Sequence, residues 1–232
     1  MKELLYSDLE TIDYKEAWDL QKDIFELRYK KEIPDVLLLL EHPHTYTLGR
    51  IADKAHLISS QEYLDQKHIS VYEIDRGGDI TYHGPGQIVG YPIIDLNQWQ
   101  KDTHKYLRGL EEIIINTCAE YGVTAIRDPR YTGVWVDNRK IAAIGIKVSR
   151  WITMHGFAFN INSDLSFFNG IIPCGIFNKE VTSLSKELNR NIDLLEVKTK
   201  LVNNFRQFFG YNSVNTLFKE EVLSLHLSAK GL

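Results

Sequence analysis

The amino-acid sequence predicts an α/β fold of the α+β type, in which a mixed β-sheet is packed by helices. Three observations lead to this prediction: strand-like segments outnumber long amphipathic ones, some neighbouring strands are joined by short turns, and strands do not alternate regularly with helices. A doubly wound parallel sheet would require that alternation. A chain of 232 residues with 44% hydrophobic and 25% charged residues is expected to form one domain, residues 1–232.

Three segments have the periodic apolar positions of amphipathic helices: residues 14–30, 103–121 and 194–209. Before the first, Asp13 and Glu16 have the spacing of a capping box, and Pro34 follows its end. Gly122 supplies a natural stop for the second. Local signals therefore mark the limits of both of these helices.

Other segments have the composition of strands: residues 36–40, 69–74, 88–94, 124–127, 134–136, 140–148 and 152–161. The first consists of five consecutive apolar residues and is expected to be fully buried. Asp137 with Asn138, and then residues 149–151, have the composition of hairpin turns. The last three segments are therefore expected to pair with their neighbours in the chain.

Composition argues against several classes of function. A net charge of −4 and a pI near 6.1 make nucleic acid a poor partner, because phosphate binding leaves a basic footprint. The longest dense apolar run, residues 36–40, is far too short to span a bilayer, and no secretory segment is apparent, so no membrane partner is expected. Two cysteines do not suggest a disulfide scaffold, and a reducing cytoplasm is the simplest compartment.

The most unusual stretch is RGGDITYHGPGQIVGYP, residues 76–92, in which five of 17 residues are glycine. Its spacing matches neither a dinucleotide-binding loop nor a P-loop, and its prolines prevent a helix from starting inside it. A hairpin with a bulge would explain the glycines but not the polar residues among them. Glycines also allow close approach of a ligand, and Arg76, Thr81, His83 and Gln87 offer polar groups beside it. We therefore interpret the stretch as a ligand-lined wall.

The two cysteines differ in context. Cys118 lies on the apolar stripe of the second helix and is expected to behave as a small hydrophobe. Cys174 lies in the turn-like IPCG, where it is either structural or presented toward a pocket. Lys140 begins a strand and is either solvated or turned inward to meet Cys174.

The histidines carry no metal-binding spacing, so no metal site is expected. His42, His44, His83 and His155 lie in separate segments. Each is either a pocket-lining residue or a hydrogen-bonded imidazole of the core.

Four blocks together resemble the lipoyl(octanoyl) transferases: residues 76–87, 138–146, 155–161 and 172–175. The resemblance implies the fold shared by biotin and lipoate protein ligases, and transfer of an octanoyl group from octanoyl-acyl carrier protein to one lysine of a lipoyl domain. Acceptors of this kind are the lipoyl domains of 2-oxoacid dehydrogenase E2 subunits and the glycine cleavage H protein. No cofactor, metal or ATP is implied, because the thioester is already activated.

The resemblance also implies roles for individual residues. Cys174 would be the acyl-accepting nucleophile and Lys140 its partner, which favours the thiolate. The implied substrate-binding residues are Arg76, Gly77, Gly78, Asp79, Ile80, Thr81, Tyr82, His83, Ala143, Ile144, Gly145, Gly156, Phe157 and Ala158. A basic patch for acidic protein partners is expected among Arg76, Arg127, Arg130, Arg139, Lys147 and Arg150.

Two departures and two rival functions accompany the resemblance. Cys118 has no assigned counterpart, and Phe157 and Phe159 are bulkier than the usual aliphatic residues, which bears on acyl-chain length. An ATP-dependent lipoate or biotin ligase would need an arginine-rich phosphate loop, whereas Arg76 is the only arginine in this one. A non-catalytic acyl- or lipoyl-domain-binding protein is the second rival.

Overall fold

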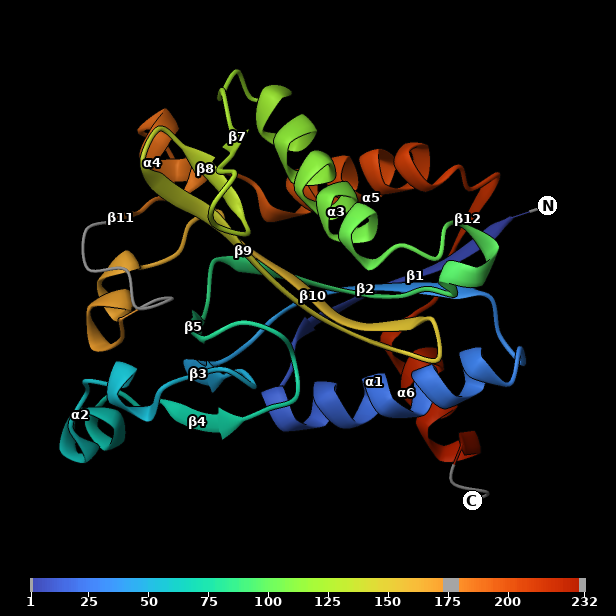
Figure 1. The fold of residues 1–232 in the computed structure, drawn as a ribbon, viewed down its shortest axis with the longest axis horizontal. Coiled ribbons are helices and arrows are strands. Elements are labelled where there is room, and N and C mark those ends of the chain that lie inside the picture. Colours follow the sequence, from blue (N-terminus) through green and yellow to red (C-terminus); the bar gives the residue numbers. More distant parts are fainter. Residues whose placement is uncertain (1, 173–179, 230–232) are drawn as a thin grey trace.

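The computed structural model describes residues 2–172 and 180–229 (Figure 1). Its strands are β1 (Glu3–Thr11), β2 (Asp35–Glu41), β3 (Thr45–Leu48), β4 (Ser70–Glu73), β5 (Ile80–His83), β6 (Gln87–Ile93), β7 (Ile126–Arg127), β8 (Val134–Val136), β9 (Arg139–Ser149), β10 (Ile152–Asn160), β11 (Glu180–Val181) and β12 (Ser213–Thr216). Its α-helices are α1 (Tyr14–Tyr29), α2 (Gln61–Gln66), α3 (Thr103–Ala119), α4 (Leu184–Leu188), α5 (Leu194–Phe209) and α6 (Lys219–Ala229). Short 3-10 helices lie at Lys54–His56, Leu96–Gln98 and Leu165–Gly170.

Most described strands form one mixed sheet in the order β12-β1-β2-β6-β10-β9-β8-β7. β1 runs parallel to both of its neighbours, whereas the strands from β2 through β7 in this order pair antiparallel. β11 adds a parallel pairing at the start of β9. The antiparallel centre distinguishes this architecture from a doubly wound parallel sheet.

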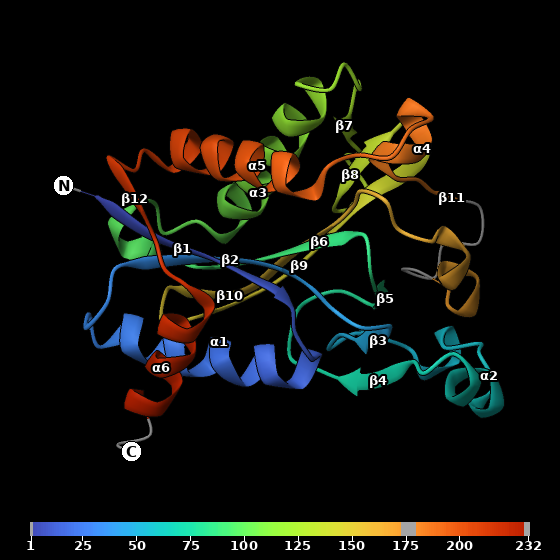
Figure 2. The same ribbon diagram turned by 180° about the vertical axis from the view of Figure 1, so that it is seen from behind.

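Helices cover both faces of this sheet (Figures 1 and 2). On one face, α3 and α5 bury Leu110, Ile114, Leu201 and Phe205 against the strands. On the other face, α1 packs with α6 over a second apolar cluster that includes Ile24. The observed layers confirm the predicted fold class.

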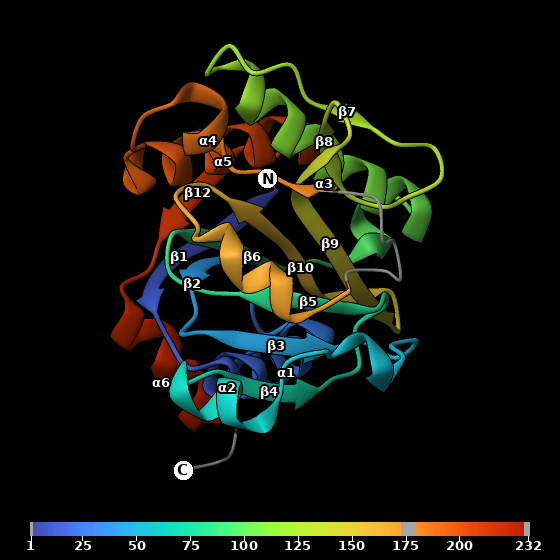
Figure 3. The same cartoon turned by 90° about the vertical axis from the view of Figure 1, so that its left-hand side faces the viewer.

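A second, smaller sheet has the strand order β4-β3-β5 and lies beside the main sheet (Figure 3). Tyr46, Tyr82 and Phe167 pack together in its own apolar cluster. The chain passes from this sheet to the main sheet between β5 and β6, inside the glycine-rich stretch. The hairpin interpretation of that stretch is therefore wrong, because its two strands are consecutive but belong to different sheets.

The three long helices are confirmed, and their caps explain why. Asp13 accepts hydrogen bonds from the backbone N–H groups of Lys15 and Glu16, and α5 has the predicted bounds, Leu194–Phe209. The hairpin turn after β9 is also confirmed. Arg150 and Trp151 both have left-handed φ angles, 52° and 64°, as a tight turn between twisted strands requires.

Several elements are absent from the sequence-based prediction: β1, β3, β5, β11, β12, α2, α4 and α6. Edge strands such as β12 are largely exposed and carry little apolar alternation. In β1, buried and partly exposed residues follow no strict period of two, because apolar clusters cover both faces: Leu4 joins one, and Leu5 and Leu9 lie at the other. Pairing with distant segments, rather than local pattern, forms these strands.

Candidate functional site

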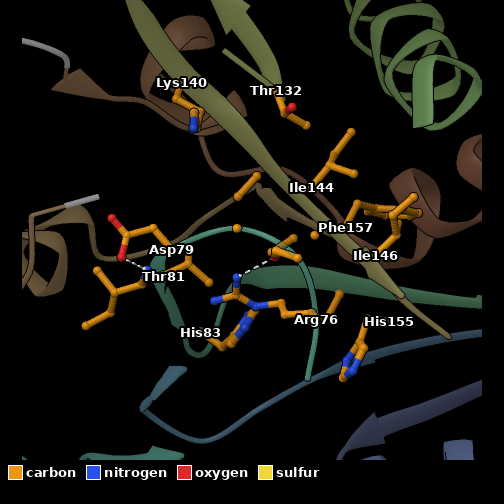
Figure 4. Close-up of a pocket in the computed structure, with 18 of the residues that line it drawn as sticks. Arg76, Asp79, Thr81, His83, Thr132, Lys140, Ile144, Ile146, His155 and Phe157 are labelled. Carbon is orange, nitrogen blue, oxygen red and sulfur yellow. Dashed lines mark hydrogen bonds between the residues drawn. The ribbon is translucent and has the colours of Figure 1, made fainter. Parts of the chain in front are cut away.

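A cavity of about 360 Å³ lies between the two sheets, where the glycine-rich stretch crosses β9 and β10 (Figure 4). It is lined by most of the residues singled out in the sequence: Arg76, Gly77, Gly78, Asp79, Ile80, Thr81, His83, Lys140, Ala143, Ile144, Gly145, Gly156, Phe157 and Ala158. Segments more than 80 positions apart in the chain thus share one pocket.

The cavity wall is a short strap, residues 75–79, that connects β4 to β5 of the small sheet and contacts β9 of the main sheet. Gly77 donates its backbone N–H to the carbonyl of Ile146 in β9 at 2.9 Å, and Gly49 donates to the carbonyl of Asp79 at 3.3 Å. Gly78 has φ of +90°, a conformation that L side chains rarely adopt. The strap is therefore held at both ends and needs glycine between them.

Small residues form the floor beneath the strap. Ala143 pairs with Ala158, and Gly145 pairs with Gly156, so all four share one face of β9 and β10. A Cβ atom on Gly145 would lie 2.8 Å from the carbonyl oxygen of Gly77, too close for any side chain. The missing side chain of Gly145 lets the strap approach the sheet and leaves a narrow slot, whereas a Cβ atom on Gly156 would meet the carbonyl oxygen of Gly90 in β6.

The guanidinium of Arg76 is buried in the strap and bound by the protein itself. Its Nη2 donates to the carbonyl and the hydroxyl of Thr47, at 2.7 and 2.9 Å, and its Nη1 donates to the carbonyl of Gly77 at 3.0 Å. These bonds join the strap to β3. The side chain therefore acts as a structural tie within the wall.

Buried imidazoles and phenols lie at the inner wall, which His83 and Tyr91 line and His42 backs. His42 Nδ1 donates to the carbonyl of Ile12 at 2.8 Å, so its Nε2 accepts a hydrogen bond from Tyr91 at 2.7 Å. His83 Nδ1 lies 3.0 Å from the Gln87 side-chain oxygen. Burial lowers the pKa of His42 to about 4, lowers that of His83 well below its usual value, and raises that of Tyr91. This wall is polar but uncharged at neutral pH.

Lys140 lies at the opposite end of the cavity from this wall. Its Nζ is 4.8 Å from the centre of the Trp135 ring, and its backbone pairs with β8 on one side and with Val181 on the other. Gly133, with φ of +124°, lies against its side chain and is held by the buried carboxylate of Glu111 at 3.0 Å. A strand, a turn and a helix together fix its position.

Cys174, the expected nucleophile, lies outside the described residues. The described chain stops at Ile172, whose N–H donates to the carbonyl of His56, and resumes at Glu180. Glu180 and Val181 pair with Arg139 and Lys140. The described chain therefore resumes in the main sheet beside Lys140.

Tyr82 is the one described residue of the expected substrate-binding set that does not line the cavity. It lies between Thr81 and His83 in β5, and the alternation of a strand turns its side chain away from them. Its hydroxyl meets His44 Nδ1 at 2.8 Å and its ring stacks on Phe167. Tyr82 supports the small sheet.

The remaining cysteine and Phe159 are core residues. Burial raises the pKa of the Cys118 thiol to about 12, in agreement with its expected apolar role. Phe159 is fully buried and does not line the cavity, whereas Phe157 does. Only Phe157 therefore remains a candidate for limiting acyl-chain length.

Sequence reasoning missed several residues around the cavity, including Tyr14, Asp75, Tyr91 and Asn160. Tyr14 and Tyr91 lie in a helix and a buried strand, where an aromatic residue ordinarily indicates core. No local pattern marks them. Asp75 directly precedes the glycine-rich stretch, and that position was the available signal.

The expected basic patch is largely neutralised. Five of its six candidates pair with carboxylates: Arg127 with Glu112, Arg130 with Asp128, Arg139 with Glu187, Lys147 with Asp75, and Arg150 with Glu26. The sixth, Arg76, is buried in the strap. A strong positive surface built from these residues is therefore not found.

Within residues 2–172 and 180–229, no cluster of three or more His, Cys, Asp or Glu side chains has a metal-binding arrangement. No helix of these ranges combines the length and the apolar character that crossing a bilayer requires.

Comparison with known proteins agrees with the resemblance drawn from the sequence. Residues 13–206 match the lipoyl protein ligase A/B catalytic domain. An octanoyltransferase from Christiangramia forsetii is 51% identical over 225 residues, which are 90% of this chain and 96% of the relative. One from Rubrobacter xylanophilus is 54% identical over 199 residues, 85% of this chain and 89% of the relative.

The fold is also known from solved structures. A bipartite lipoate protein ligase from Thermoplasma acidophilum superimposes with a TM-score of 0.76 at 16% identity, covering 98% of this chain and 92% of that one. The expected ligase-like fold is thereby confirmed. On the family match and the identities to its relatives, the chain is an acyltransferase and belongs to the lipoyl protein ligase A/B catalytic-domain family.

Proposed function

We propose that the whole chain acts as one octanoyltransferase domain, which moves an octanoyl group from acyl carrier protein to one lysine of a lipoyl domain through a thioester on Cys174. The observation that carries the proposal is the slot between the strap and the small-residue floor, which leads from Lys140 into the protein. The name octanoyltransferase, which close relatives carry, supports octanoyl as the group that is transferred.

The slot suits an acyl chain of medium length. Its floor of Ala143, Gly145, Gly156 and Ala158 presents no polar side chain, and Ile144 and Phe157 add apolar surface. Burying the six methylenes of an octanoyl tail contributes on the order of 5 kcal/mol. Burial also keeps the His83 imidazole of the inner wall neutral, so the tail meets no charged imidazole there.

Cysteine chemistry follows from a thiolate near Lys140. The thiolate of Cys174 attacks the carbonyl carbon of the octanoyl thioester, a new C–S bond forms, and the C–S bond to carrier protein breaks. The departing carrier thiolate takes a proton from the Lys140 ammonium, which becomes neutral. The acceptor lysine, as a free amine, then attacks the acyl-enzyme, and the thiolate of Cys174 leaves. The proton released from that amine passes to Lys140 when it is neutral.

The rival ATP-dependent ligase would need a basic group free to hold phosphate. Arg76 is the only arginine of the loop, and its guanidinium donates three hydrogen bonds to Thr47 and Gly77. These bonds favour a tie within the wall over a phosphate ligand. They support the transferase over the ligase.

The partners are those that the chemistry requires. Octanoyl-acyl carrier protein is the donor, and the acceptors are lipoyl domains such as those of 2-oxoacid dehydrogenase E2 subunits and the H protein. Because most candidate basic residues are paired with carboxylates, we expect shape and the acyl chain to contribute more to docking than a broad positive surface.

The test is single-turnover acylation with octanoyl carrier protein in the absence of ATP, followed by intact mass and peptide mapping. We expect an octanoyl adduct on Cys174 and transfer to a lipoyl domain. Cys174→Ala should lower transfer by roughly three orders of magnitude or more, while Cys118→Ala, the matched buried cysteine, retains it. Lys140→Ala should move the midpoint of thiol alkylation to higher pH.

Each outcome separates the alternatives. Undiminished transfer by Cys174→Ala would contradict the thioester mechanism. Transfer that needs ATP and free octanoate would indicate the ligase instead. Binding of both partners without any adduct would indicate a non-catalytic protein.

A further inference from the structure

His155 occupies an unfavourable environment. It lies within β10 with φ of +56°, a left-handed conformation that is uncommon for a residue with a side chain. Its imidazole is 1% exposed, and its Nδ1 has no hydrogen-bond partner among the residues that the structure describes. Strain and an unpaired buried atom each cost free energy, and such residues concentrate at functional sites.

The other ring nitrogen explains what holds the imidazole in place. Nε2 lies 2.8 Å from one oxygen of Asp75, whose second oxygen pairs with Lys147 at 2.5 Å. The hydrogen bond from His155 holds the pKa of Asp75 well below its usual range, and burial lowers the pKa of His155. Asp75 is therefore an acceptor, and the proton of the neutral imidazole lies on Nε2.

The backbone of His155 is tied as well. Its N–H donates to the side-chain oxygen of Gln21, a buried residue of α1, at 2.8 Å. This bond ties β10 to α1 at its left-handed residue.

Asp75 and His155 meet where the strap joins the sheet. Asp75 immediately precedes Arg76, and Gly77 donates to the carbonyl of Ile146, the residue directly opposite His155 in the β9–β10 register. The side-chain bond and the backbone bond therefore hold the strap at one rung of the sheet. At its far end Asp79 meets His56 Nδ1 at 2.6 Å.

We propose that the Asp75–His155 pair is a positioning device that fixes the height of the glycine strap above the floor, and so sets which acyl-chain lengths the slot accepts. This inference rests on the proposed function. Lys140 precedes Ile146 by six residues of β9, a distance of about 20 Å, so His155 does not touch the reacting thioester. Figure 4 shows Lys140 and His155 on opposite sides of Arg76.

The effect of the Asp75–His155 pair can be measured separately from that of the neighbouring Lys147 charge. His155→Ala removes the donor to Asp75, whereas His155→Gln offers an amide N–H in its place. Lys147→Met removes the other partner of the same carboxylate and leaves the pair intact, which makes it the matched control. Asp75→Asn replaces the charged acceptor by a neutral one of the same size.

The experiment measures acylation of Cys174 from carrier protein loaded with chains of six to twelve carbons, and the Kd of free octanoate by calorimetry. Loss of a hydrogen bond to a charged group predicts a KM for octanoyl carrier protein and a Kd for octanoate about tenfold higher in His155→Ala. We expect kcat to change less than threefold and the chain-length preference to flatten. Lys147→Met should match the wild type, and His155→Gln should recover most of the loss.

The coupling between Asp75 and His155 supplies an independent check, which remains available if His155→Ala folds poorly. In a double-mutant cycle of Asp75→Asn with His155→Phe, whose ring keeps the bulk of the imidazole but cannot donate, measured on octanoate Kd, the double variant should be no weaker than the weaker single variant. Additive effects, or an unchanged Kd and chain-length preference in folded His155→Ala, would overturn the inference. If the wild type transfers nothing, the proposed function fails, and the octanoate measurements still decide on the pair.

Discussion

Burial keeps single histidines around the cavity neutral at pH 7. For that reason the free energy of unfolding should depend on pH. His42 is fully buried between Ile12 and Tyr91, and its pKa is lowered to about 4 from an ordinary 6.5. In the unfolded chain His42 therefore binds a proton as pH falls below 6.5, whereas in the folded protein it does so only near pH 4. Burial lowers the pKa of His83 in the same direction.

We predict that the free energy of unfolding falls as pH falls through the window from 6.5 to 4. His42 alone contributes a loss of about 2 kcal/mol between pH 6.5 and pH 5, at roughly 1.4 kcal/mol for each pH unit. Urea unfolding at pH 7 and pH 5 measures it, with His42→Gln as the control that should reduce the slope. Equal stability at both pH values would contradict the neutral inner wall.

At the scale of elements, the end of α1 shows a cap whose residue does not suit its conformation. Lys31 donates to the carbonyl of Arg28, and Glu32 donates to that of Leu27, the two bonds of a Schellman motif. Lys31 has φ of +63°, where glycine is preferred, whereas Lys30 at the cap has φ of −71°. Both lysines are exposed, so backbone preference dominates.

We predict opposite effects of the same substitution at these neighbours. Lys31→Gly should raise the free energy of unfolding by about 0.5–1 kcal/mol, because it relieves the left-handed strain. Lys30→Gly should lower it by a similar amount, because it adds chain entropy at a right-handed position. Thermal unfolding measures both, with shifts of roughly 2–4 °C per kcal/mol, and a loss of stability in Lys31→Gly would refute the assignment of strain.

At the scale of the whole molecule, one buried carboxylate joins segments from both ends of the chain. Asp35 accepts from Arg28 Nε at 2.8 Å, from the Tyr211 hydroxyl at 2.7 Å and from the N–H of Asp95 at 2.9 Å. Arg28 and Asp35 are 3% and 2% exposed, so water does not screen the pair. Helix α1, strand β2 and the segment after α5 thus depend on one residue.

We predict that Asp35→Ala lowers the free energy of unfolding by about 3–5 kcal/mol, because it leaves the buried guanidinium of Arg28 poorly compensated. Tyr211→Phe, which removes one hydrogen bond, should cost about 1–3 kcal/mol. Glu73→Gln breaks the exposed pair with Lys54 and should change stability by no more than about 1 kcal/mol. Similar urea midpoints for Asp35→Ala and Glu73→Gln would contradict the role of Asp35.

Elements with local signals could be predicted, and those formed by distant pairing could not. The Asp13 cap and the apolar stripe of residues 194–209 lie within a few residues of the helices that they bound. Strand β5 gives no such signal, because it exists through pairing with β3 across more than thirty residues. The motif places Tyr82 in the site together with its neighbours, because a sequence motif does not show on which face of a strand each side chain lies.

The sequence by itself determined the mixed fold class, the long helices, the family and the stretches that carry the site, because caps, periodicity and motifs are local. The tertiary structure decided which of these residues share a cavity, and it showed that Arg76 ties the strap and that most candidate basic residues are paired. It also brought Asp75 and His155 together across 80 positions. Such contacts depend on how the two sheets and α1 pack, and packing is a property of the folded chain as a whole.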